Sequence, residues 1–127
     1  MTFPARKKIL LVDDSPTVLL MEQMVLQDGP YELLSAANGE QAVQVALTER
    51  PDLILMDVVM PGMDGFEACR RLRAEAATRA TPIILLTTRG NAEYIERGYE
   101  SGCTDYLTKP VDGTELWIKV SHILGLA

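Results

Sequence analysis

Three aspartates stand directly after apolar segments of this chain, and this placement suggests that they act together. Asp57 ends the apolar run 53–56, and Asp13 and Asp14 end the run 9–12. Short apolar runs of this kind are typical of strands buried on both faces of a parallel sheet. Ligands of such sheets bind outside the carboxyl ends of the strands. We therefore expect the three carboxylates to share one rim of the sheet.

A hydroxyl and an amine follow two further strand candidates. Thr87 ends the apolar run 83–86, and Lys109 follows the short segment 105–107. Two like charges 4 Å apart repel by about 4 kcal/mol at an effective dielectric constant of about 20, so gathered acids need a compensating cation. Mg²⁺ favours one or two carboxylates together with waters and phosphate oxygens. The set predicts phosphoryl chemistry, in which a carboxylate can itself be the nucleophile.

Helical segments alternate with the strand candidates along the chain. N-cap residues mark the starts of several helices, as at Ser15 before Pro16, at Asn38 and at Asp64. Strands that alternate with helices predict an α/β domain, a doubly wound parallel sheet with helices on both faces. The strands are expected at about 8–12, 31–36, 53–56, 83–86 and 105–107, and the helices at about 16–27, 38–49, 64–73, 91–101 and 116–124.

The composition is that of one ordinary soluble domain. The chain has 127 residues, of which 47% are hydrophobic and 24% charged, so we expect a single domain over 1–127 with its core at about 8–124. Its 12 basic and 18 acidic residues give a net charge of −6, which disfavours direct binding to nucleic acid. No apolar run approaches the roughly 20 residues that span a membrane, and the N-terminus lacks a signal-peptide core. These features favour a cytoplasmic protein with no membrane partner.

Metal chemistry based on cysteine or histidine is not indicated. Cys69 and Cys103 lack metal-type spacing and are expected to be free, mostly buried thiols. His122, the single histidine, lies in the last helical segment and is expected to be structural.

Taken together, the motifs resemble the receiver domain of two-component response regulators, the CheY-like family. Each motif is weak alone, but their order and their positions at strand ends are specific. The resemblance runs from about Lys8 to Leu124 and implies a flavodoxin-like fold with strand order 2-1-3-4-5. It also implies a signalling switch rather than a dedicated enzyme. The matching residues are Asp13-Asp14, Asp57 with Met60-Pro61 and Asp64-Gly65, Thr87, Tyr106 and Lys109-Pro110.

The same resemblance implies how the acids would act. Asp57 would accept a phosphoryl group from the phosphohistidine of a sensor histidine kinase. Asp14, Asp57 and the backbone carbonyl of Val59 would hold Mg²⁺. Asp13 would act on the metal largely through water.

The remaining motif residues would read out the phosphoryl group. By resemblance, Lys109 would contact the phosphoryl oxygens, and its bond to Pro110 would be cis. Thr87 would move toward the phosphate, and Tyr106 would turn inward behind it. Val59 and Arg89 occupy positions that tune the lifetime of the acyl phosphate in this family. Because apolar Val59 cannot hold an attacking water, we expect slow self-dephosphorylation.

The signal is expected to leave through a protein-binding surface that engages a downstream target. The resemblance places this surface on the fourth helix, fifth strand and fifth helix. A stand-alone receiver of this kind, monomeric or weakly dimeric, would by analogy control chemotaxis or motility. The residues expected on the surface are Ile95, Tyr99, Tyr106, Lys119 and His122.

Several alternatives stay open or are disfavoured by single residues. The chain could be a fragment of a larger response regulator or hybrid kinase, or a scaffold that works without phosphorylation. A haloacid-dehalogenase-type phosphatase needs a second acid two residues after the nucleophile, where Val59 stands. A flavodoxin-type electron carrier needs a hydroxyl-rich phosphate loop after the first strand, where Asp13 and Asp14 would instead repel phosphate.

Overall fold

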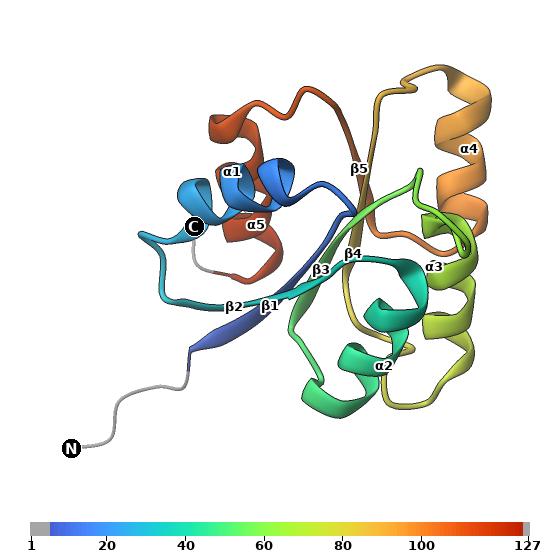
Figure 1. Ribbon diagram of the computed structural model, residues 1–127, viewed down its shortest axis with the longest axis horizontal. Coiled ribbons are helices and arrows are strands. Elements are labelled where there is room, and N and C mark those ends of the chain that lie inside the picture. The colour runs from blue at the N-terminus through green and yellow to red at the C-terminus, as the bar shows by residue number, and fades with distance from the viewer. Residues whose placement is uncertain (1–5, 126–127) are drawn as a thin grey trace.

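A computed structural model describes residues 6–125, and its centre is a five-stranded parallel sheet (Figure 1). The spatial order is β2-β1-β3-β4-β5, so the expected order 2-1-3-4-5 is confirmed. Residues 1–5, which belong to the N-terminal segment where we expected no signal-peptide core, lie outside the described residues. The strands are β1 (Lys7–Val12), β2 (Tyr31–Ala36), β3 (Leu53–Asp57), β4 (Ile83–Thr87) and β5 (Asp105–Thr108).

Five helices alternate with the strands, and each begins at a side-chain cap. Ser15, Asn38, Asp64, Asn91 and Asp112 each accept a hydrogen bond from a backbone N–H of the first helical turn. The last helix was expected to begin at Leu116, but it begins at Gly113. The reason is that Asp112 already caps the N–H groups of Thr114 and Glu115. The helices are α1 (Pro16–Leu26), α2 (Gly39–Glu49), α3 (Gly65–Ala74), α4 (Ala92–Glu100) and α5 (Gly113–Ile123).

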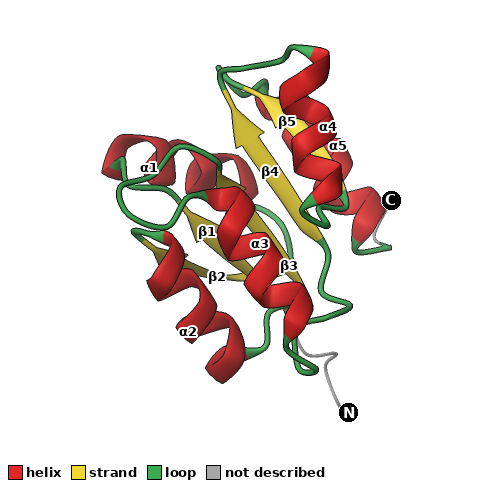
Figure 2. Cartoon of the chain, turned by 90° about the vertical axis from the view of Figure 1, so that its right-hand side faces the viewer, coloured by secondary structure: helices red, strands yellow, loops and turns green. Residues whose placement is uncertain are grey.

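The helices cover both faces of the sheet. Figures 1 and 2 show α1 and α5 on one side, and α2, α3 and α4 on the other. Alternate residues of β1 point to opposite faces of the sheet and contribute to two separate core layers. Ile9 and Leu11 pack toward α1 and α5, whereas Leu10 and Val12 pack toward α2 and α3. Both cysteines are free and buried, as expected. No helix among the described residues is long and apolar enough to cross a bilayer.

The pairing of the strands brings the carboxyl ends of β1, β3, β4 and β5 to one rim of the sheet. Val12 pairs with Met56, Asp57 pairs with Leu86, and Thr87 pairs with Thr108. The residues that follow β1, end β3 and β4, and follow β5 therefore lie side by side. The loop after β3 folds back tightly, since a Cβ atom on Gly65 would lie 2.4 Å from the Asp57 carbonyl oxygen.

Candidate functional site

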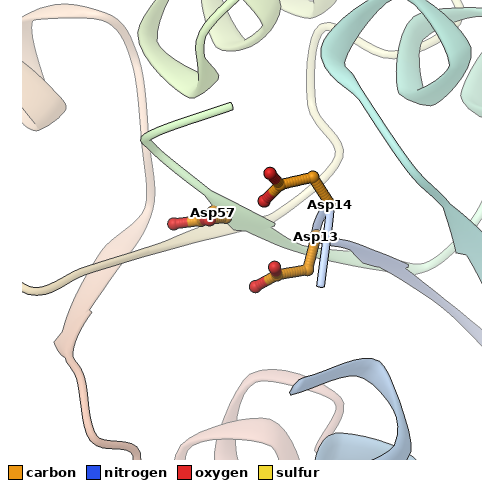
Figure 3. Close-up of side chains that lie close together, drawn as sticks. All are labelled: Asp13, Asp14 and Asp57. Carbon is orange, nitrogen blue, oxygen red and sulfur yellow. The ribbon is translucent and has the colours of Figure 1, made fainter. Parts of the chain in front are cut away.

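Three carboxylates gather at the carboxyl ends of β1 and β3 (Figure 3). Asp13, Asp14 and Asp57 each offer an oxygen, and these oxygens lie within 4.8 Å of one another. Asp13 and Asp57 are 2% and 7% exposed, whereas Asp14 lies at the surface. Figure 3 shows the side chains of Asp13 and Asp14 both extending from the end of β1 toward the side on which Asp57 lies. A group of this kind could hold a divalent cation with Asp14 facing solvent.

Lys109 compensates part of this negative charge. Its Nζ lies 2.8 Å from Asp13 Oδ2 and 3.3 Å from Asp57 Oδ1. The backbone holds the lysine here, because the Lys109 N–H donates to the Thr87 carbonyl at 2.7 Å and the Lys109-Pro110 bond is cis, as the resemblance implied. Burial alone would lower the pKa of Lys109, but its hydrogen bond to Asp13 and the charges of Asp57 and Asp13 raise it above the ordinary value. The amine therefore stays protonated between the two acids.

Asp57 is a more basic carboxylate than a surface aspartate. Burial and then the charge of Asp13 raise its pKa, while Lys109 opposes both effects. A more basic carboxylate is a better nucleophile, and the charge of Lys109 favours its ionised form. The environment therefore suits Asp57 to attack an electrophile such as phosphorus.

Thr87 and Tyr106 lie together next to the acids. Thr87 is fully buried, and its hydroxyl accepts a hydrogen bond from the Arg89 N–H at 3.1 Å. Tyr106 is 9% exposed, and its hydroxyl donates to the Arg89 carbonyl at 2.7 Å. The tyrosine ring therefore lies inward, and its expected movement on phosphorylation stays a prediction. The Arg89 side chain lies 5.8 Å from the centre of the Tyr94 ring.

The surface expected to bind a target contains fewer displayed residues than predicted. The prediction that Tyr106 is displayed on this surface is wrong, because its side chain is turned inward. Ile95 is half-buried and packs against the α3 side of the core, so it is also largely withdrawn. Tyr99 is 49% exposed, and Lys119 forms an ion pair with Asp105 at 2.9 Å. His122 is exposed in the last turn of α5 rather than packed in the core, so its expected structural role is not supported.

One buried acid beside the site was not singled out from the sequence. Glu22 is 3% exposed, and its Oε2 atom has no hydrogen-bond partner. Burial and then the charge of Asp13 raise its pKa to about 8. The signal that could have found it is charge pattern, because Glu22 is the single charged residue of α1.

Replacing Glu22 with glutamine should flatten the dependence of stability on pH. In the folded protein the acid keeps its proton up to about pH 8, whereas its ordinary pKa is 4.5. Raising the pH between these values therefore favours unfolding, because the unfolded chain releases the proton first. Relative to wild type, Glu22→Gln should gain about 3 kcal/mol in free energy of unfolding between pH 4.5 and pH 7.

Urea denaturation without Mg²⁺ measures this difference. Glu40→Gln, at an exposed position in the first turn of α2, is the matched control and should follow wild type at every pH. If the free energy of unfolding changed with pH in the same way for Glu22→Gln and wild type, the raised pKa assigned to buried Glu22 would be contradicted.

The fold and the site together define a class of protein. It is a doubly wound α/β domain of the flavodoxin-like topology, whose strand ends bring together three acids, a lysine and a buried threonine. The profile of the response regulator receiver domain matches residues 9–121. The chain therefore belongs to the family of response regulator receiver domains, which are signalling switches rather than dedicated enzymes.

Individual relatives agree with this assignment. The chain is 42% identical over 118 residues to protein PilH of Pseudomonas aeruginosa, covering 93% of this chain and 98% of PilH. Its fold matches the chemotaxis protein CheY4 of Vibrio cholerae with a TM-score of 0.88 at 37% identity, covering 94% of this chain and 99% of CheY4. The chain spans only 26% to 52% of seven other curated relatives.

One solved structure of a relative includes a metal. The receiver domain of the sensor histidine kinase PA1611 from Pseudomonas aeruginosa matches with a TM-score of 0.87 at 36% identity, covering 95% of this chain and 99% of that domain. That structure has a magnesium ion coordinated in its active-site cleft.

Proposed function

We propose that this chain is a phosphorylation-controlled protein-binding switch in which Asp57 accepts a phosphoryl group from a histidine kinase. The observation that carries the proposal is the grouping of Asp57 with two further acids and Lys109 at one rim of the sheet. The buried, basic carboxylate of Asp57 supplies the nucleophile. Lys109 supplies a positive charge already placed against it, which is suited to phosphoryl oxygens.

The acid group fits Mg²⁺. Three carboxylate oxygens within 4.8 Å of one another match the hard oxygen ligands that this ion prefers. Asp14, Asp57 and the Val59 carbonyl would hold the ion, and Asp13, already paired with Lys109, would act through water. When bound, Mg²⁺ would supply positive charge that stabilises the phosphoryl oxygens during transfer. The magnesium in the PA1611 receiver domain supports this assignment.

The buried hydroxyl pair links the site to the output face. Both hydroxyls bond to the Arg89 backbone: that of Thr87 accepts from its N–H, and that of Tyr106 donates to its carbonyl. A phosphoryl group on Asp57 would add about −1.5 to −2 charges and new acceptors. Movement of the Thr87 hydroxyl toward these acceptors would release the Arg89 N–H and alter the chain beside Tyr106. A bias of a few kcal/mol suffices to change which state dominates.

The output surface is proposed on α4, β5 and α5, around Tyr99, Lys119 and His122. Exposed Tyr99 offers an aromatic anchor of the kind that dominates interfaces. Similarity to the chemotaxis protein CheY4 supports a target involved in motility.

A pull-down from lysate of the source cells tests the proposed switch. Wild type with Mg²⁺ and beryllofluoride, a phosphoryl mimic, should retain a target protein that the untreated protein and Asp57→Asn do not retain. Tyr99→Ala should lose most of that retention while still taking up a phosphoryl group. Equal retention by wild type and Asp57→Asn would favour a scaffold that works without phosphorylation.

Val59→Asn should speed loss of the phosphoryl group by about tenfold, which corresponds to about 1.4 kcal/mol of barrier. Val59 is 59% exposed, two residues beyond Asp57, and offers no side-chain hydrogen bond to an attacking water. An amide at this position could orient that water. Decay of the phosphorylated protein after removal of donor measures the rate, with Val59→Leu as an apolar control that should decay like wild type. A Val59→Asn decay no faster than that of Val59→Leu would count against the role of this position.

A further inference from the structure

A cavity of about 370 Å³ lies next to Lys109, between α1, the β5–α5 connection and α5. Figure 1 shows these three segments side by side at one end of the sheet. Its volume falls within the range of small-molecule sites, which are mostly apolar with a few polar groups. The walls are formed mainly by the apolar side chains of Val18, Met21, Val25, Pro110, Val111 and Leu116.

One wall of this cavity contains an acid whose hydrogen bonding is incomplete. Glu22 lines the cavity, is 3% exposed, and its enclosed Oε2 atom has no partner. Lys109 also lines the cavity, but its amine already bonds to Asp13 at 2.8 Å and lies 3.3 Å from Asp57. A buried polar atom without a hydrogen-bond partner is costly, and a ligand that supplies the partner removes that cost.

The charge around the cavity favours a cation. Glu22 and the three aspartates of the rim bring four acidic side chains to this end of the sheet, against the single amine of Lys109. Glu22 keeps its proton in the unliganded protein because burial raises its pKa to about 8, so an ammonium group binds as Glu22 releases that proton to solvent. A cluster of one sign attracts small ions of the other sign. An ammonium group would therefore gain both a hydrogen bond to Glu22 and a favourable potential, whereas a neutral donor would gain only the hydrogen bond.

We propose that this cavity is a binding site for a small molecule with an apolar body and one ammonium group, the ammonium donating to Glu22. An apolar cavity of about 150 Å³ accepts one benzene ring. The larger space here suits a ring with a short alkyl chain, or an alkyl chain of similar bulk. The proposal does not rest on phosphorylation of Asp57, so its test stands apart from that of the proposed function.

Methyl NMR titration of the full chain, without Mg²⁺ or phosphodonor, tests the site. The probes are 2-phenylethylamine, the neutral 2-phenylethanol and the anion phenylacetate. The amine should saturate with a millimolar Kd and shift the methyl signals of Val18, Val25, Val111 and Leu116. The alcohol should bind at least about tenfold more weakly, a difference of about 1.4 kcal/mol, and phenylacetate should not bind.

Three variants separate the role of Glu22 from that of the cavity. Glu22→Gln should weaken binding of the amine by at least about tenfold and leave the affinity for the alcohol unchanged. Glu40→Gln, an exposed position of α2 on the other face, should bind like wild type. Val18→Phe fills the cavity and should abolish binding of every probe, which keeps the test decisive if Glu22→Gln does not fold.

Several results would overturn the proposal. These are equal affinity for the three probes, shifts confined to other surfaces, or amine binding that is unchanged in Glu22→Gln. Tighter binding of N-acetyl-lysine methylamide than of 2-phenylethylamine would overturn the assignment to a small molecule, because it would favour the lysine side chain of a partner protein as the occupant.

Discussion

Asp57→Asn should leave the protein unable to take up a phosphoryl group from acetyl phosphate in the presence of Mg²⁺, where wild type takes up one. Asparagine keeps the shape of the side chain but has no anionic oxygen to attack phosphorus. Removing the charge should also stabilise the fold at neutral pH, because burial and Asp13 both disfavour the ionised form of Asp57. Intact-protein mass spectrometry measures uptake, and urea denaturation without Mg²⁺ measures stability.

The matched control for this loss is an aspartate outside the site. Asp28 is exposed after α1, and Asp28→Asn should be labelled like wild type. Uptake by Asp57→Asn at the wild-type level would show that another residue is the acceptor. Lower stability of Asp57→Asn at neutral pH would contradict the electrostatic description of the rim.

Lys109→Met should have the second largest effect, because it removes the cation that compensates two buried acids. Rates of phosphoryl uptake should fall by about 10²–10³-fold, as is typical when one preorganised group facing the reacting charge is lost. The free energy of unfolding should fall by about 3–5 kcal/mol, since Asp13 is left buried without its partner at 2.8 Å. Part of that stability should return with Mg²⁺, which replaces some of the missing positive charge.

A surface lysine separates the local effect from the loss of one charge. Lys8 pairs with Glu49 at 3.1 Å, and the two side chains are 34% and 45% exposed, so Lys8→Met should change stability little and leave uptake intact. Measurements are uptake kinetics with acetyl phosphate and urea denaturation with and without Mg²⁺. If Lys109→Met lost no more stability than Lys8→Met, the ion pairs at the rim would not have the assigned strength.

The sheet and the position of the site could be predicted because they depend on local patterns. The apolar runs that end at Asp57 and Thr87 became β3 and β4, with every residue buried. The side-chain caps at Asn38 and Asp64 start α2 and α3. Once the strands are parallel, their carboxyl ends share a rim, so the grouping of Asp13, Asp14 and Asp57 follows from topology.

Side-chain direction was harder to predict, because it depends on packing between distant segments. Ile95 and Tyr99 are one turn apart on α4, yet Ile95 packs inward and Tyr99 faces solvent. Tyr106 turns inward toward the Arg89 carbonyl, a contact between β5 and the loop after β4 that periodicity does not describe. Glu22 looked like an ordinary polar residue of an amphipathic helix, and only the packing of α1 and the β5–α5 connection around it shows its burial.

The role of Asp57 as phosphoryl acceptor is tested most directly by locating the phosphoryl group with tandem mass spectrometry after incubation with Mg²⁺ and acetyl phosphate. We expect one modified peptide, with the phosphoryl group on Asp57 and none on Asp13, Asp14 or Asp64. A group found on any other side chain, or no modification with acetyl phosphate or any other phosphodonor, would contradict it.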